Sequence, residues 1–227
     1  QPAAPPEPLS GIGTVVVAPG QGLMTVFESL GASVVVAGGQ TMNPSTEELL
    51  KAVEDTPSDD VVVLPNNKNI ILAAEQAKEL SAKSVEVVPT ISVPQGISAL
   101  LALNYQADLP TNARIMAEAA SSIETAEITR AVRSVQLDGM LVQEGEVIGL
   151  VNGKLAAKGD LPAGVALEAL AGMNAEDYEI ITIYYGEAIT ADQAQQIADH
   201  IMERYPEQEV ELVDGGQPHY YYILSAE

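Results

Sequence analysis

The sequence has no cysteine among its 227 residues. That absence excludes a disulfide scaffold, a thiol nucleophile and every thiolate metal site. No apolar run approaches the roughly 20 residues that span a bilayer, and no basic-then-apolar signal peptide is present. We therefore expect no direct membrane insertion and a cytoplasmic location. A body of this length buries about 70% of the surface that its unfolded chain exposes, so its core needs no covalent staples.

Basic residues are scarce as well, because 10 lysines and arginines face 32 acidic residues and leave a net charge of −22. Such a chain repels phosphate backbones and anionic lipid headgroups, which argues against nucleic-acid and membrane roles. The charge is explained most simply by solubility. A basic partner protein is the alternative, since opposite fields raise encounter rates.

Stock catalytic motifs are missing too. The Gly-Gln-Gly run at 20–22 resembles a dinucleotide loop, but Thr25 stands where the third glycine belongs, and a strand-to-helix turn needs glycines anyway. There is no phosphate loop ending in Gly-Lys-Ser/Thr and no Gly-x-Ser-x-Gly elbow. His200 and His219 lack a metal-ligand spacing. We expect no catalysis and no cofactor in this chain by itself.

The most informative stretch that is present runs from Val61 to Ala77. Four consecutive aliphatics at 61–64 predict a strand covered on both faces, and Pro65 ends it. Three asparagines follow within four residues, before a helical pattern begins. One asparagine is enough to cap a helix, so three exceed what a cap needs. The carboxyl end of a central strand is where open α/β sheets meet ligands and partners.

Two further loops share this polar character, one at residues 39–46 and the other at 88–96. We expect the three loops to cluster on one edge of a sheet, between two lobes. The candidate partner- or ligand-binding residues are Thr41, Asn43, Ser45, Asn66, Asn67, Asn69, Thr90 and Gln95. An equally weighted interpretation is that these groups bond only to one another and fix the loops.

The chain order predicts two α/β lobes. Residues 1–10 form a Pro/Ala-rich linker that we expect to tether an upstream domain. Residues 11–128 alternate strands and helices, ending with a helix at about 112–126, and predict a first lobe with a parallel sheet. Residues 129–227 predict a second lobe with a mixed sheet. It contains a hairpin at Asn152-Gly153, because both turn residues need positive φ.

Four segments in this order carry a family resemblance: GGQTMNPSTEELL, LPNNKNIILAAEQA, VPTISVPQGISALLALN and DGGQPHYYYILSAE. The chain resembles the C-terminal domain of the dihydroxyacetone-kinase-like catalytic subunit of bacterial fatty-acid kinase. The resemblance implies a two-lobed DegV-like fold. It also implies an upstream domain that holds ATP and Mg²⁺, and a separate DegV-type fatty-acid-binding protein that presents its bound fatty acid for phosphorylation.

The chain departs from the DegV-type carriers at two motifs. The carriers hold the fatty-acid carboxylate partly with the serine of a Thr-Ser-x-Pro-Ser run, where this chain has Met42. Residues 214–219 do not reproduce their His-x-Gly-Pro-Gly turn. We therefore expect a docking domain for the carrier. A small-ligand or fatty-acid binding module is the alternative, and a structural dimerisation domain, hence a homodimer, stays open.

Overall fold

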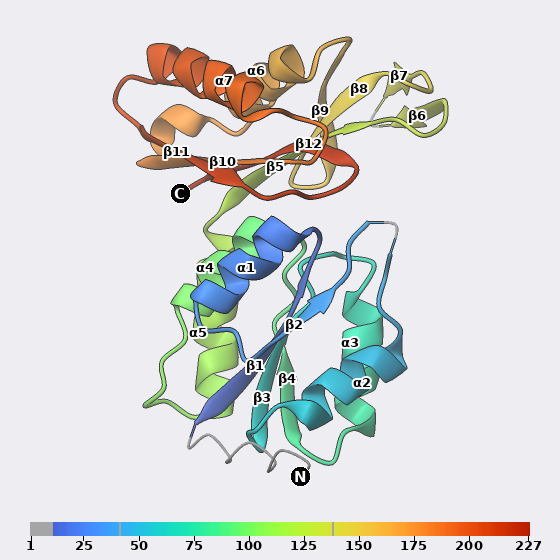
Figure 1. The fold of residues 1–227 in the computed structure, drawn as a ribbon, viewed down its shortest axis with the longest axis vertical. Helices are drawn as coiled ribbons and strands as arrows, with labels where there is room; N and C mark the ends of the chain where they lie inside the picture. The colour runs from blue at the N-terminus through green and yellow to red at the C-terminus, as the bar shows by residue number, and fades with distance from the viewer. Residues whose placement is uncertain (1–10, 41, 138) are drawn as a thin grey trace. The chain divides into compact units, whose positions relative to one another are not determined.

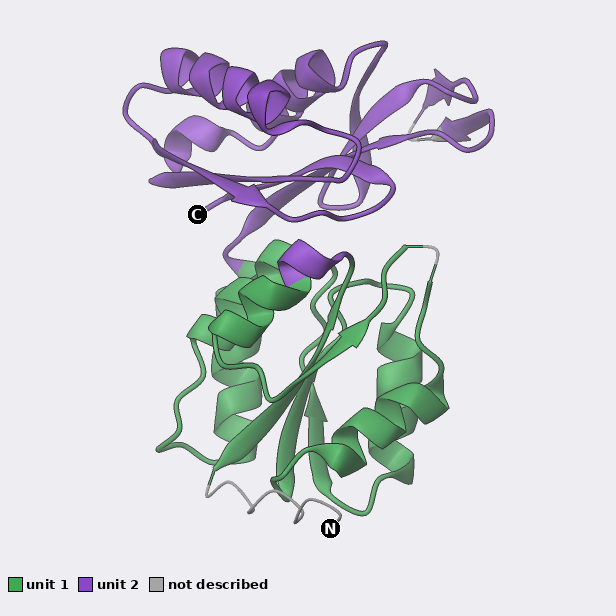
Figure 2. Cartoon of the chain, in the orientation of Figure 1, with its two compact units in different colours: residues 1–19, 24–121 green, residues 20–23, 122–227 purple. Residues whose placement is uncertain are grey.

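The computed structural model describes residues 11–40, 42–137 and 139–227, so the linker at 1–10 and Thr41 lie outside the described part (Figure 1). The chain divides into two compact units, one of residues 1–19 and 24–121 and the other of residues 20–23 and 122–227 (Figure 2). The first unit carries a parallel sheet and the second a mixed one. The predicted α/β class with these two kinds of sheet is confirmed.

The first unit is built on a four-stranded parallel sheet in the order β2-β1-β3-β4. The strands are β1 (Ile12–Ala18), β2 (Val34–Ala37), β3 (Asp60–Leu64) and β4 (Ser84–Val87). The helices are α1 (Gln21–Ser29), α2 (Thr46–Asp55), α3 (Ile71–Leu80), α4 (Val93–Leu101) and α5 (Leu109–Ser121). Helices α2 and α3 cover one face and α1, α4 and α5 the other (Figure 1). This double cover explains the unbroken aliphatic run of β3, which is fully buried.

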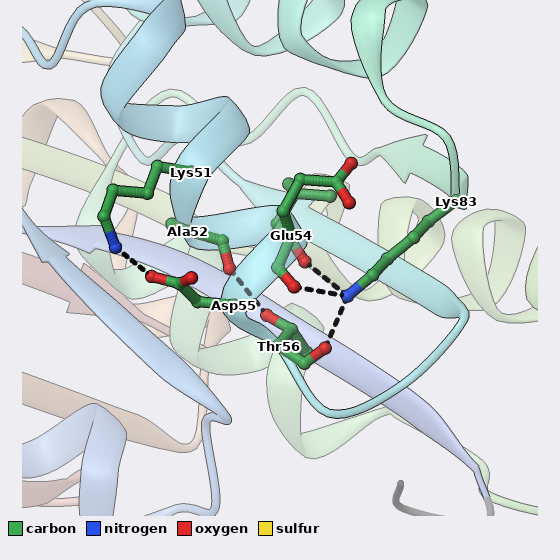
Figure 3. Close-up of polar contacts among 7 residues, drawn as sticks. Lys51, Ala52, Glu54, Asp55, Thr56 and Lys83 are labelled. Atoms are coloured by element: carbon green, nitrogen blue, oxygen red, sulfur yellow. Dashed lines mark hydrogen bonds and ion pairs between the residues drawn. The ribbon is translucent and has the colours of Figure 1, made fainter. Parts of the chain in front are cut away.

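One lysine side chain caps the C-terminal end of α2 with hydrogen bonds (Figure 3). The ammonium of Lys83 donates to the carbonyl oxygens of Val53 at 2.9 Å, Glu54 at 2.9 Å and Thr56 at 2.5 Å. The hydroxyl of Thr56 donates to the carbonyl of Ala52 at 2.8 Å. These bonds serve carbonyl groups that a helix end leaves without an intrahelical partner. They also place a cation at the negative end of the helix dipole.

The second unit is built on a six-stranded sheet in the order β11-β10-β12-β5-β8-β9, in which only β10 and β11 pair in parallel. Its strands are β5 (Glu124–Arg130), β8 (Val147–Val151), β9 (Lys154–Gly159), β10 (Ile180–Tyr185), β11 (Glu209–Asp214) and β12 (Tyr220–Ala226), with a separate hairpin of β6 (Val135–Leu137) and β7 (Met140–Val142). Helices α6 (Pro162–Gly172) and α7 (Ala191–Arg204) cover one face (Figure 1). Ile128, Leu170, Ile183 and Ile197 form part of the core between them.

The end of the first lobe differs from the sequence prediction. A helix was expected as far as Ala126, but α5 ends at Ser121 and strand β5 begins at Glu124. Burial alternates from one residue to the next, as in a strand: Ala126 and Ile128 are fully buried, while Glu127 between them is half-buried. The predicted lobe boundary at residue 128 therefore falls inside β5, and the compact units divide after Ser121.

The predicted Asn-Gly hairpin is confirmed. Asn152 has φ 49° and Gly153 has φ 77°, and the flanking strands β8 and β9 pair antiparallel. Positive φ at both central residues gives the turn whose twist matches that of the strands. In the preceding segment, Val135–Leu137 is extended and pairs antiparallel with Met140–Val142.

Candidate functional site

Asn66 is the centre of the polar edge of the first unit, which is formed by the loops that follow β2, β3 and β4. It follows β3 in the left-handed conformation, with φ 54°, which asparagine tolerates better than most residues. Its backbone N–H donates to the hydroxyl of Thr90 at 3.0 Å, and that hydroxyl donates to the Asn66 Oδ1 at 2.7 Å. Its Nδ2 donates to the carbonyl of Val17 at 2.9 Å. One residue thus ties together the carboxyl ends of β1, β3 and β4.

The first turn of α4 packs directly on this carboxamide. A Cβ built on Gly96 would lie 2.0 Å from the Asn66 Oδ1, far inside any real contact distance. Residue 96 must therefore be glycine for α4 to approach the edge so closely. No local pattern indicated this requirement, because a glycine in the first turns of a helix has several explanations.

The second link joins the loop after β2 to the loop after β3. The Asn67 Nδ2 donates to the Gln40 Oε1 at 3.1 Å, and the Asn67 Oδ1 accepts from the backbone N–H of Asn69 at 2.9 Å. Asn67 is nearly buried, whereas the side chain of Asn69 is exposed. Asn67 therefore shapes its own loop, and Asn69 offers its carboxamide to solvent.

Ser45 and Gln95 serve the helices that follow them. Ser45 caps α2, accepting from the Glu48 N–H at 3.2 Å while its own N–H donates to the Glu48 carboxylate at 2.8 Å. Donation to this carboxylate from the Ser45 N–H, and from the Ser45 hydroxyl at 2.8 Å, holds the pKa of Glu48 below its ordinary value. The Gln95 Oε1 accepts from the Ile91 N–H at 2.9 Å, and so closes the start of α4. Both residues have a structural task.

The structure brings four of the eight predicted site residues into hydrogen bonds at this edge. The three loops lie together at one edge of the sheet, as expected, because side-chain hydrogen bonds join the second loop to the first and to the third. Their expected position between the lobes stays a prediction. Thr41 lies outside the described residues. Of the rest, Asn66, Asn67, Thr90 and Gln95 bond within the edge, and Asn43, Ser45 and Asn69 are exposed. The neighbouring Met42 is also exposed, at 69%.

The Gly-Gln-Gly turn before α1 has a packing explanation. Gly20 has φ 76°, and a Cβ on Gly22 would lie 2.2 Å from the carbonyl oxygen of Asp214. The Leu23 N–H donates to the carbonyl of Gly215 at 3.0 Å. All of these residues belong to the second unit. The glycines allow two backbone segments to come into contact. The N-terminus of α1 therefore packs against residues 214–215 of the chain, and this explains the glycines without a bound phosphate.

A carboxyl–phenol pair in the second unit was missed by sequence reasoning. Burial raises the pKa of Glu127 to about 7, although a hydrogen bond from Tyr220 lowers it in part. Burial, together with the Glu127 charge, also raises the pKa of Tyr220. Glu127 lies on β5 and Tyr220 on β12, which is its partner strand. The position of Glu127 between two core residues of an alternating strand was the available signal.

A metal site needs a cluster of ligands and a membrane-spanning segment needs a long apolar helix, and the described residues provide neither. No group of three or more histidine or carboxylate side chains in residues 11–40, 42–137 and 139–227 is arranged to hold a metal ion. His200 is exposed on α7, and His219 sits in a turn with φ 70°. No described helix is long and apolar enough to cross a bilayer.

Comparison with known proteins identifies relatives over nearly the whole chain. The C-terminal family of FakA-like fatty acid kinase subunits matches residues 13–227. Protein YloV of Bacillus subtilis (strain 168) is 43% identical over 215 residues, which are 95% of this chain but 39% of YloV. The chain therefore spans about two fifths of this curated relative.

Solved structures share the fold at low sequence identity. The DegV family protein Cg2579 of Corynebacterium glutamicum superposes with a TM-score of 0.68 at 15% identity, covering 95% of this chain and 96% of that one. The Fak B3 protein of Streptococcus pneumoniae, solved with linoleic acid, superposes with a TM-score of 0.61 at 9% identity, covering 96% and 99%. These likenesses show a DegV-like fold.

Proposed function

Because the chain belongs to the FakA-like C-terminal family of fatty acid kinases, we propose that it is a non-catalytic docking domain of a cytoplasmic fatty-acid kinase. Its partner is a separate DegV-type fatty-acid-binding protein. An upstream ATP-binding domain of the same polypeptide then phosphorylates the fatty acid that this partner presents. The upstream domain is proposed by analogy with YloV, of which this chain covers only 39%.

One observation favours docking over lipid carrying: buried polar groups at the polar edge of the first unit form hydrogen bonds with one another. The Asn66 N–H and the Thr90 hydroxyl donate to each other's residue and the Asn66 Nδ2 donates to Val17, so these groups already have partners within the edge. Met42 takes the place of a carrier hydroxyl and is exposed to solvent. A buried carboxylate without donors costs several kcal/mol. This edge therefore favours a partner met at the surface.

The predicted site residues divide into two groups within this proposal. Asn66, Asn67, Thr90 and Gln95 position the loops. Asn43, Ser45 and Asn69 are the exposed members through which a partner is met. Ser45 also caps α2, so Asn43 and Asn69 are the cleaner positions for a functional test.

The direct test is calorimetric titration of the 227-residue chain with a fatty-acid-loaded DegV-type protein from the same organism. Saturable binding by the natural sequence is expected. The variant Asn43→Ala/Asn69→Ala is expected to bind at least several-fold more weakly with an unchanged melting temperature. No binding by the natural sequence would overturn the docking function. Unchanged binding by the variant would keep the function and remove the polar edge from the interface.

The runner-up is a fatty-acid binding module. It is favoured by the fold shared with a protein solved with linoleic acid. Met42 and the closed polar edge oppose it. Lipid extracted from the purified chain separates the two functions.

A further inference from the structure

The β6–β7 hairpin has a small core of its own in the second unit. Val142 from β7 is fully buried beside Ile148 of β8 and Leu155 of β9, and Ala131 completes the cluster. Ile148 alternates along β8 with Val147, which belongs to the core under α6 and α7. The hairpin therefore packs on the face of β8 and β9 that these helices leave uncovered. It projects beyond the end of the six-stranded sheet (Figure 1).

Two basic side chains next to this hairpin donate hydrogen bonds to uncharged oxygen atoms. The Lys158 Nζ donates to the carbonyl of Leu141 at 2.7 Å. The Arg130 Nη1 donates to the carbonyl of Gly145 at 3.1 Å, and its Nε donates to the hydroxyl of Tyr221 at 2.9 Å. A purely structural interpretation is that Lys158 and Arg130 serve only to stabilise the hairpin. Carbonyl and phenol oxygens satisfy the donors, however, without cancelling the positive charges.

Two large apolar side chains stand outside the small core. Val132 is 86% exposed and Leu141 is 62% exposed. The cluster of Ala131, Val142, Ile148 and Leu155 is complete without them. Single exposed apolar residues are ordinary, so the charge around these two is the second observation that a binding feature requires.

The surrounding segment is basic relative to the chain as a whole. Residues 130–158 hold four of the ten basic residues and three of the 32 acidic ones, so they carry a net charge of +1 in a chain of −22. The basic residues are Arg130, Arg133, Lys154 and Lys158. Glu146 lies 3.5 Å from the Lys158 ammonium and offsets it in part. Arg133 is exposed and forms no ion pair with any other described residue.

We propose that this hairpin surface docks an acidic, partly apolar surface of the lipid-carrying partner, an inference that rests on the proposed function. The hairpin surface consists of Arg130, Val132, Arg133, Leu141 and Lys158. Most of the chain is net negative and repels an acidic partner, so a net-positive segment that also exposes Val132 and Leu141 favours where and in which orientation that partner lands. Self-repulsion between two copies at −22 disfavours a second copy of this chain as the occupant.

The test measures binding of the same fatty-acid-loaded DegV-type protein to hairpin variants of the 227-residue chain. Val132→Asp/Arg133→Glu is expected to weaken binding at least tenfold, and Leu141→Ser severalfold. Raising the salt concentration from about 50 to about 500 mM weakens binding by the natural sequence and has less effect on the charge-reversed variant. The matched controls are Leu161→Ser, a leucine that is 72% exposed elsewhere in the second unit, and Arg114→Glu on α5.

Each result decides for or against the hairpin surface. Weaker binding by both hairpin variants at unchanged melting temperatures, with unchanged controls, supports it. Binding that is intact in both variants overturns the hairpin surface and leaves the docking function standing. No binding by the natural sequence overturns the docking function and the hairpin surface together. Salt-sensitive self-association in sedimentation experiments that Arg133→Glu abolishes would identify a second copy as the occupant and overturn it as well.

Discussion

Asn66 and Thr90 hold each other across the ends of two adjacent parallel strands. The Asn66 N–H donates to the Thr90 hydroxyl at 3.0 Å, and that hydroxyl donates back to the Asn66 Oδ1 at 2.7 Å. Thr90 is fully buried and Asn66 is 6% exposed. The pair is therefore satisfied without water, which makes it expensive to break and unsuited to releasing its groups to a ligand.

We predict that Thr90→Val destabilises the chain by about 1–3 kcal/mol, because the isosteric valine leaves the buried Asn66 N–H and Oδ1 without this partner. Urea unfolding measures the loss. Carrier binding by the folded fraction is expected to stay unchanged. A stable Thr90→Val variant that no longer binds the carrier would contradict the structural role given to this pair.

We predict that Gly96→Ala destabilises the chain by about 1–3 kcal/mol, since the added methyl group meets the Asn66 carboxamide and displaces it. Gly164→Ala on α6 is the matched control, because a Cβ there meets nothing within 4 Å. Alanine is the better helix former, so this control is expected to gain up to about 1 kcal/mol. Equal effects of the two substitutions in thermal unfolding would show that the close approach at Gly96 is not real.

We predict that Lys83→Met costs about 1–2 kcal/mol. The substitution keeps an aliphatic stem but removes three hydrogen bonds and a favourable charge from the end of α2. Lys51→Met is the control, because its ion pair with Asp55 is exposed and contributes less than about 1 kcal/mol (Figure 3). Helix α2 is expected to exchange its amide hydrogens faster only in the Lys83 variant.

We predict a pH-dependent loss of stability that belongs to Glu127. Its pKa in the folded chain is about 7, above its ordinary value of 4.5, so folding favours the protonated carboxyl. The stability contributed at pH 4.5 is lost as the pH rises towards 7, by at most about 3 kcal/mol. Glu127→Gln keeps an acceptor for Tyr220 and removes the titration.

The measurement is urea unfolding of both proteins from about pH 4.5 to about pH 8, a range that spans the ordinary and the raised pKa of Glu127. The variant is expected to be more stable than the natural sequence at the alkaline end, and the difference shrinks towards the acidic end. Glu79→Gln, at an exposed position of α3, is the matched control for removing one carboxylate. Parallel curves for the Glu127 variant and the natural sequence would show that Glu127 titrates normally.

We predict that the chain purified from cells carries no stoichiometric long-chain fatty acid. Met42 replaces a carrier hydroxyl, and the buried Thr90 hydroxyl already donates to Asn66, so a buried carboxylate lacks these two donors. Mass spectrometry of the denatured protein measures the lipid content, and a DegV-type fatty-acid-binding protein purified in parallel is the positive control. One equivalent of fatty acid per chain would favour the binding module instead.

The sequence by itself determined the features that rest on local backbone physics. Unbroken aliphatic runs such as 61–64 specify strands covered on both faces, and the Asn152-Gly153 pair specifies a tight hairpin. Ser45 followed by Glu48 specifies a helix start. In each case the residues that decide the conformation lie within a few positions of one another.

Only the tertiary structure decided which polar groups are free. Asn66 and Thr90 are 24 positions apart and Asn66 and Val17 are 49 apart, so no local pattern shows that they satisfy one another. The need for glycine at Gly22 comes from the Asp214 carbonyl, and the shifted pKa of Glu127 comes from burial in a sheet whose strands pair far along the chain. Hydrogen-bond satisfaction, close backbone approach and desolvation depend on contacts between distant segments, and folding alone brings those segments together.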